Sequence, residues 1–364
     1  MLLADMGATV VKVESPEGDD TRRWRPPVRG DESSYYLSIN RNKHSIVLDF
    51  AQPGDLAVAR DLARRADVVV ENFRAGGLAR FGLDYESVRS SNPAVVYASI
   101  TGFGTREGAD LPGYDLLVQA LSGLMSLTGA PEGPGFRSGV AVFDVIAGLH
   151  VGLGVLAALR DRDRSGEGQL VEVDLMSSAL SGLVNQSATY VMAGVVPMRM
   201  GNEHPSLYPY GPMPTADGDL IIAAGNDRQF RTLCGALRRP ELADDERFVT
   251  VARRNANRAA LRPLLEEALS AHDAQEWFRR LRRAGVPSAP IQDVAQGIAT
   301  AVDLGLEPVV TVGDGDDSVP MIRHPVTFSR TPAGHDLVPP ALGSATDRVR
   351  RWLAEPSANG RPPG

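Results

Sequence analysis

The sequence predicts an α/β protein with a Rossmann-like, doubly wound large domain and a small α+β domain. Two observations support this prediction. In the first half of the chain, short β-branched runs alternate with helical patterns, an order typical of parallel sheets whose strands are joined by helices. Near residue 200 the composition changes to a loop rich in Pro, Gly, Tyr and Asn, and amphipathic helices follow it.

The first half contains most of the expected parallel sheet. Several runs are continuously apolar rather than alternating, which favours strands covered on both faces. Strands are expected at 9–14, 45–49, 68–71, 94–101 and 170–175. Helices are expected at 55–66, 78–90, 115–127, 144–160 and 176–193.

The second half predicts the smaller domain and a return to the larger one. A turn at Asp217-Gly218 precedes a strand at 219–224, and helices are expected at 228–236, 258–270, 274–284 and 345–353. The predicted divisions are 1–195 for the first part of the large domain, 205–298 for the small domain and 299–364 for the return. The N-terminus has no signal-peptide pattern. It is typical of the end of a helix capped by Gly7, and we expect further sequence upstream of it.

Composition excludes several classes of protein. The 364 residues carry 38 Lys and Arg against 45 Asp and Glu, a net charge of −7, which argues against binding of nucleic acid. One cysteine, Cys234, excludes an internal disulfide and fits a reducing, cytoplasmic compartment. The six histidines show no helical pairing, so no metal site is expected. Residues 138–159 are apolar enough to imitate a membrane span, but their glycines favour a packed core helix, and no membrane association is expected.

Asp144 is the most informative single residue. It is a lone charge at the start of this apolar helix, so it must be satisfied there. It can be an N-cap that the helix terminus keeps ionised. It can equally be a carboxylate nucleophile that forms a covalent acyl intermediate. Asp115, after Tyr114, can be a second N-cap.

The ordered motifs resemble the class III CoA-transferase family, which includes formyl-CoA transferase and carnitine CoA-transferase. They appear in family order over nearly the whole chain: LLADMGATVVKVESPEGDDTR, INRNKHSIVLDF, VVENFRAGGLARFGLDYE, ITGFG, GYDLLVQALSGLMSLTG, VAVFDVIAGLHVGLGVLAAL and AGVPSAPI. Two features depart from the family pattern. About two dozen residues are absent before Met1, and Leu342-Gly343-Ser344-Ala345-Thr346 stands where the family has Leu-Gly-Glu-His-Thr.

The resemblance implies roles for particular residues. Asp144 matches the family nucleophile. The positions that match CoA contacts are Leu48, Asn72, Phe73 and Arg80, and Lys43 with the preceding Asn40 turn is expected to share the charged end of CoA with Arg80. The positions that match the acyl pocket are Trp24, Tyr35, Tyr114 and Asp115.

The implied activity is transfer of CoA from an acyl-CoA to a carboxylic acid, through an aspartyl mixed anhydride and an enzyme–CoA thioester. Coenzyme A is then a substrate, with no permanently bound cofactor, and the family forms an interlocked homodimer. Two alternatives remain open. An α-methylacyl-CoA racemase needs two bases, and Tyr114 stands where its histidine would be. The chain can also be an inactive relative that only binds CoA.

Overall fold

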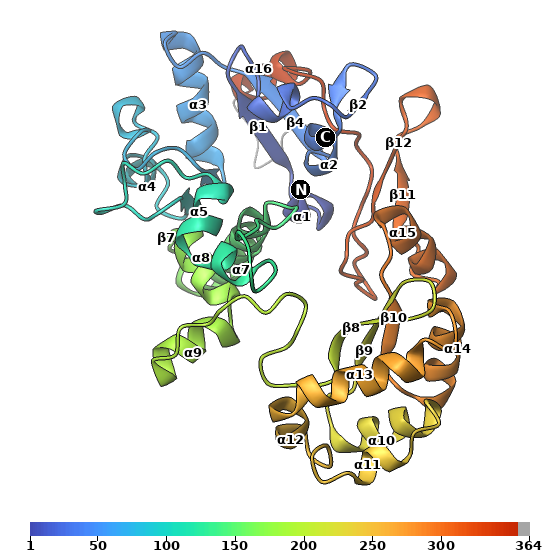
Figure 1. Ribbon diagram of the computed structural model, residues 1–364. Coiled ribbons are helices and arrows are strands. Elements are labelled where there is room, and N and C mark those ends of the chain that lie inside the picture. Colours follow the sequence, from blue (N-terminus) through green and yellow to red (C-terminus); the bar gives the residue numbers. More distant parts are fainter. Residues whose placement is uncertain (356–364) are drawn as a thin grey trace. The chain divides into compact units, whose positions relative to one another are not determined.

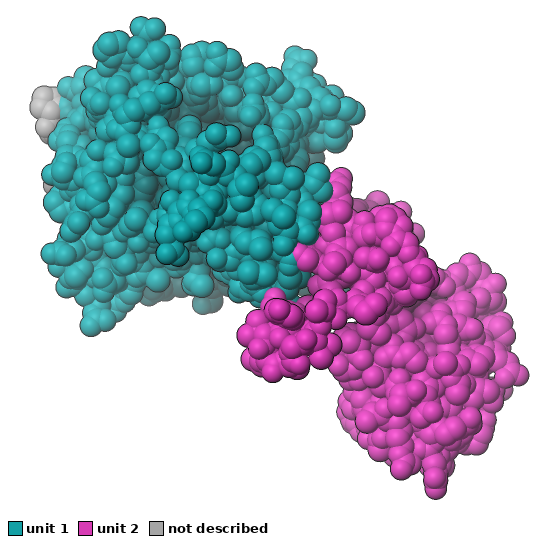
Figure 2. Space-filling model, turned by 60° about the vertical axis from the view of Figure 1, so that its left-hand side comes forward, with its two compact units in different colours: residues 1–122, 140–184, 301–364 teal, residues 123–139, 185–300 magenta. Residues whose placement is uncertain are grey.

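The computed structural model describes residues 1–355 and confirms a mixed α/β fold (Figure 1). The chain forms two compact units (Figure 2). Unit 1 contains Met1–Ser122, Val140–Val184 and the described residues from Ala301 onward, and unit 2 contains Gly123–Gly139 and Asn185–Thr300. The domain boundaries expected from the sequence stay a prediction.

Unit 1 holds the parallel strands, in two sheets. β1 (Val10–Glu14) pairs with β4 (Lys43–Val47), and β6 (Val96–Thr101) lies between β5 (Val68–Glu71) and β7 (Leu170–Asp174). The single doubly wound sheet expected from the sequence is therefore not formed within the described residues. The physical reason is that neither β1 nor β4 forms backbone hydrogen bonds with β5, β6 or β7.

β6 has a buried face on each side. Tyr97 packs in one hydrophobic cluster, which includes Ile46 of β4. Val96 and Ala98 pack in another, together with Val151 of α7 (Val142–Ser165). Alternate side chains of a strand point to opposite faces, so a strand buried on both sides needs the continuous apolar run seen here.

Helices cover these sheets and carry the chain between them. α16 (Thr346–Ala354) packs against β4 and α3 (Pro53–Arg65), which brings the C-terminal part of the described chain onto the first sheet. The helices of unit 1 are α1 (Leu2–Asp5), α2 (Ser34–Ile39), α3 (Pro53–Arg65), α4 (Tyr85–Ser91), α5 (Asp115–Leu121), α7, α8 (Leu175–Gly182) and α16 (Thr346–Ala354). The further strands are β2 (Val28–Arg29), β3 (Glu32–Ser33), β11 (Val309–Val312) and β12 (Val319–Ile322), and the short helical turns are η1 (Asp20–Arg23), η2 (Ala79–Phe81) and η3 (Gly315–Asp317).

Two expected helices are broken. The pattern at 115–127 forms α5 and α6 (Leu124–Leu127), separated at Gly123, which has a φ of +93°. The pattern at 176–193 forms α8 and α9 (Asn185–Ala193), separated at Val184, which has a φ of +44°. A left-handed residue cannot continue a right-handed helix, and both breaks fall where the chain passes between units.

Unit 2 is built on an antiparallel sheet with β9 (Asp219–Ala223) between β8 (Tyr210–Pro214) and β10 (Ser288–Pro290). Its core includes Phe230, Leu265 and Trp277, one from each of the three helices that the sequence predicts there. These helices are α10 (Asp227–Ala236), α13 (Arg258–Leu269) and α14 (Ala274–Ala284). α11 (Glu241–Asp244) and α12 (Val251–Ala256) also belong to this unit, and α15 (Val294–Asp303) begins in it and ends in unit 1.

Candidate active site

Asp115 and Asp144 meet at the start of α7. Asp115 is the first residue of α5, and its Oδ1 accepts the backbone N–H of Phe143 at 2.8 Å and that of Asp144 at 3.3 Å. Its Oδ2 accepts a hydrogen bond from Gln119. Asp115 therefore caps α7 from a neighbouring helix. Asp144 is the third residue of α7, and the alternative that made it the N-cap is wrong.

The Asp144 carboxylate has no such structural role. Among residues 1–355, no hydrogen bond reaches its side-chain oxygens. Although one side of the residue faces solvent, burial by surrounding protein atoms and then the charge of Asp115 raise the pKa of Asp144 to about 6. A free helix N-terminus would lower the pKa of a carboxyl group. Here Asp115 already accepts the N–H groups of Phe143 and Asp144, and the pKa of Asp144 is raised instead. At pH 7 the carboxylate is still mostly ionised.

Trp24 and Tyr35 form an aromatic pair beside this carboxylate. Their rings meet edge to face with centroids 4.9 Å apart, and both line a pocket of about 580 Å³. Burial raises the pKa of Tyr35, and the charges of Asp144 and Asp115 raise it further. Tyr35 thus lies within electrostatic range of the expected nucleophile and of Asp115, and Trp24 packs against Tyr35. Tyr114, the fourth residue expected at the acyl pocket, precedes Asp115 and leaves 68% of its surface exposed.

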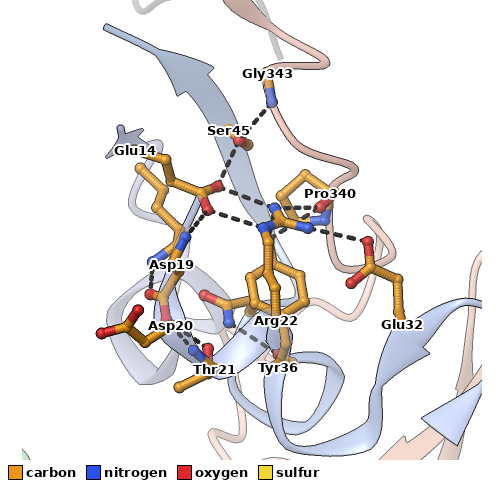
Figure 3. Close-up of polar contacts among 12 residues, drawn as sticks. Glu14, Asp19, Asp20, Thr21, Arg22, Glu32, Tyr36, Ser45, Pro340 and Gly343 are labelled. Carbon is orange, nitrogen blue, oxygen red and sulfur yellow. Dashed lines mark hydrogen bonds and ion pairs between the residues drawn. The ribbon is translucent and has the colours of Figure 1, made fainter. Parts of the chain in front are cut away.

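A buried arginine anchors the segment that carries both aromatic residues (Figure 3). Arg22 makes a two-pronged ion pair with Glu14, with Nε–Oε2 and Nη2–Oε1 distances of 2.9 and 3.0 Å. The same guanidinium bonds Glu32 and the Tyr36 hydroxyl, and it donates to the Pro340 carbonyl at 3.0 Å. We call Glu14, Arg22, Glu32 and Tyr36 the Arg22 clamp.

The clamp holds both ends of the aromatic segment. Arg22 lies two residues before Trp24, and Tyr36 directly follows Tyr35. Between them, the Ser33 hydroxyl donates to the Trp24 carbonyl at 2.7 Å. Arg22 and Glu14 are both buried, and a buried charge without its partner is strongly unfavourable, so the clamp fixes the backbone from which Trp24 and Tyr35 project.

Three of the expected CoA contacts follow the carboxyl ends of parallel strands. Leu48 comes directly after β4, and Asn72 and Phe73 come directly after β5. Ligands of open α/β sheets bind at this edge. Asn72 and Phe73 are exposed, whereas the Leu48 side chain is 2% exposed in the core and its backbone N–H donates to the Glu14 carbonyl at 3.0 Å. Arg80 in η2 is exposed, and no carboxylate of the described chain pairs with it.

The Asn40 turn does not fit the expected phosphate contact. Arg41 is 1% exposed and ion-paired with Asp5, and Asn42 donates to the same carboxylate. Arg41 and Asn42 already have these partners inside the protein, so neither offers a free donor to the charged end of CoA. Lys43 lies at the amino end of β4, at the opposite end from Leu48. It bonds Asn40, and burial followed by repulsion from Lys12 lowers the pKa of Lys43 to about 8.

Comparison with known proteins identifies the family. The family model described as CoA-transferase family III matches residues 1–346. The chain is 43% identical to the succinate–glutarate CoA-transferase of Agrobacterium fabrum, over 96% of this chain and 89% of that one. It is 38% identical to the acetyl-CoA:oxalate CoA-transferase of Acetobacter aceti, over 98% of this chain and 92% of that one.

A solved structure shares the fold. The crystal structure of a CaiB/BaiF family protein from Brucella suis superposes with a TM-score of 0.86 at 41% identity, covering 97% of this chain and 93% of that one. The resemblance inferred from the motifs is therefore confirmed. This chain belongs to CoA-transferase family III, and it is an enzyme of the acyl-CoA:carboxylate CoA-transferase class.

Proposed function

We propose that Asp144 is the nucleophile of the transfer reaction. The observation that supports this proposal is that two neighbouring carboxylates have different hydrogen-bond partners. Asp115 caps α7, and Asp144 presents unbonded oxygens beside the pocket of Trp24 and Tyr35. A carboxylate in this position can act as an attacking group instead of a structural one.

In the proposed reaction, acyl groups and CoA are transferred in succession through the Asp144 carboxyl group. The ionised Asp144 attacks the thioester carbonyl, the C–S bond breaks, and CoA thiolate leaves behind a mixed anhydride. The thiolate then attacks the Asp144 carbonyl carbon, which releases the donor carboxylate and forms an enzyme–CoA thioester. The acceptor carboxylate attacks this thioester and displaces CoA thiolate. The thiolate finally attacks the acceptor's acyl carbon, yielding the new acyl-CoA and free Asp144.

Short dicarboxylic acids are the proposed acyl groups. Relatives of this chain are named for succinate, glutarate and oxalate, each of which carries two carboxylates. We place the acyl part in the pocket of Trp24 and Tyr35, with Tyr114 at its exposed side. We place CoA along Leu48, Asn72, Phe73 and Arg80. The racemase alternative is not favoured, because a tyrosine near pH 7 is a poor substitute for a histidine base.

A homodimer is the proposed assembly. Val145, Leu149, Leu153 and Leu156 recur at helical spacing on α7, and each leaves 46–69% of its surface exposed. By length and composition, α7 is also the one helix in residues 1–355 that could cross a membrane. We propose a second copy of the chain as the cover of this apolar stripe, because a contiguous exposed apolar face on a folded protein marks an interaction site.

Substitution of the nucleophile tests the reaction. We expect Asp144→Asn to fold and to lose transfer by at least about 10³-fold, because the amide cannot form the anhydride. Asp273→Asn is the matched control, since Asp273 caps α14 in unit 2 and contacts none of the site residues. Transfer is measured as exchange of labelled CoA between thioester and carboxylate. Near-normal exchange by Asp144→Asn would remove Asp144 from the mechanism.

A further inference from the structure

Arg25 contributes a positive charge to the acyl pocket. The pocket is lined by residues 24–27 together with Ser34, Tyr35 and Ser38. The pocket is a depression of about 580 Å³ that is open to solvent, and Trp24 and Tyr35 are both partly exposed in it. Pro26 and Pro27 add apolar surface to the pocket. Arg25 is the one charged residue among the residues that line the pocket.

The Arg25 guanidinium is held in place but its charge is not neutralised. Its Nε donates to the Arg22 carbonyl at 3.2 Å, and its Nη2 donates to the Asp31 carbonyl. Both partners are backbone oxygens, and no ion pair with a carboxylate is formed within residues 1–355. Two carbonyls orient the planar fork, and the remaining N–H groups stay available for an anion.

Arg25 is also tied to the Arg22 clamp. The carbonyl that accepts from Arg25 belongs to Arg22, whose own side chain is fixed by Glu14 and Tyr36. A recognition group must be positioned by a rigid support in order to discriminate between ligands. The clamp provides that support. Tyr35, which lines the same pocket, interacts electrostatically with Asp144.

We propose that Arg25 binds the distal carboxylate of a dicarboxylic acyl group while its proximal carbonyl faces Asp144. This inference rests on the proposed function, since it assigns the acyl group to the pocket. An arginine fork and a carboxylate form a charge-assisted, two-pronged contact, and an apolar acyl chain offers nothing to that fork. Arg25 is thus the specificity-determining residue for dicarboxylyl over monocarboxylyl substrates.

Succinyl-CoA and butyryl-CoA are the matched probes, because they differ by a carboxylate in place of a terminal methyl group. For wild type we expect a higher kcat/KM with succinyl-CoA. Arg25→Gln should lower kcat/KM for succinyl-CoA roughly 10- to 150-fold and leave butyryl-CoA within about threefold. Arg25→Lys should fall between wild type and Arg25→Gln, because it keeps the charge and loses the fork.

Arg23→Gln is the matched control. Arg23 lies two residues away, is exposed and pairs with Asp20. Arg23→Gln therefore removes the same positive charge as Arg25→Gln, but at a residue that does not line the pocket. It should keep the wild-type ratio between the two thioesters. If Arg25→Gln weakens both thioesters equally, Arg25 serves the CoA part and the inference is overturned. An equal preference of wild type for both thioesters would overturn it too. A wild-type protein that transfers neither would contradict the proposed function itself.

Discussion

At the scale of single residues, the site depends on two carboxylates with different partners. Asp115 is 9% exposed and satisfies two backbone N–H groups and Gln119, whereas Asp144 keeps its oxygens unbonded. The sequence identified both residues but could not assign the cap, because a chain pattern does not show which carboxylate crosses from one helix to the start of another. The motif resemblance was needed to favour Asp144 as the nucleophile.

The raised pKa of Asp144 predicts the acid limb of the pH profile. The nucleophile must be ionised, so kcat/KM should fall as the pH falls below about 6 and stay level above it. Asp115→Asn keeps an oxygen to cap α7 but removes the neighbouring negative charge, which should lower the pKa of Asp144 and move the limb to lower pH. Wild type and Asp115→Asn are assayed with the same substrate, so titration of the CoA phosphate affects both pH profiles equally. An unmoved limb would show that Asp115 does not influence the ionisation of Asp144.

Arg80 predicts a phosphate contact. The side chain is exposed and free of carboxylate partners among the described residues, so Arg80→Ala should weaken binding of free CoA roughly 10- to 150-fold at low salt, with the difference shrinking as salt rises. Arg89→Ala, an exposed arginine on α4, is the control. Titration calorimetry measures these affinities. Equal affinities of wild type and Arg80→Ala for CoA would show that Arg80 is a solvated surface residue that does not contact CoA.

At the scale of elements, the sequence predicted those whose pattern is local. The strand at 68–71 and the helix at 274–284 have the predicted bounds, because a β-branched run and an Asp-capped amphipathic run each specify their structure locally. The Arg22 clamp and the β11–β12 pair escaped prediction. In the sequence Arg22 resembles an exposed charge, because its burial depends on Glu14 in the preceding strand and on Pro340, which lies 318 residues away. Glu14 at the end of an apolar strand was the available signal.

The clamp predicts a loss of activity without an unusual loss of stability. Tyr36→Phe removes a hydroxyl that bonds Arg22 and donates to the Pro340 carbonyl at 2.9 Å. Tyr97→Phe removes an equally buried hydroxyl that donates to the Leu83 carbonyl at 2.7 Å, outside the site. Each should cost about 0.5–1.5 kcal/mol of unfolding free energy. Only Tyr36→Phe should slow transfer, by roughly tenfold, because it loosens the support of Trp24 and Tyr35.

Thermal unfolding and steady-state transfer rates measure the two effects side by side. The fluorescence of Trp24, obtained by subtracting the spectrum of the matching Trp24→Phe protein, reports the aromatic segment independently of activity. We expect it to change in Tyr36→Phe and not in Tyr97→Phe. Equal transfer rates for the two variants, together with unchanged Trp24 emission, would show that the clamp is structural and does not position the pocket.

At the scale of the whole molecule, composition and element order predicted a mixed α/β protein. The predicted domain boundaries stay a prediction. The structure groups residues 123–139 with 185–300 in one compact unit, a long-range grouping that local patterns do not show. The two parallel sheets were likewise not foreseen, because strand patterns show which segments are strands but not which edges pair.

The apolar stripe of α7 predicts a stable dimer. Leu153→Glu places a charge in its centre and should shift the protein toward monomer, because burying an unpaired carboxylate against a second copy is strongly unfavourable. Leu304→Glu, at a leucine of similar exposure outside α7, should leave the assembly unchanged. Sedimentation equilibrium measures both. A wild-type protein that sediments as a folded monomer at micromolar concentration would be inconsistent with a second copy covering this face.

The most direct test of the account is chemical trapping of the intermediate on Asp144. The protein is incubated with succinyl-CoA and hydroxylamine, digested, and analysed by mass spectrometry. Hydroxylamine attacks an activated aspartyl carbonyl, so we predict a hydroxamate on Asp144 in wild type and none on any residue of Asp144→Asn. Full transfer activity with an unmodified Asp144 peptide, or a hydroxamate on a different carboxylate, would contradict the account.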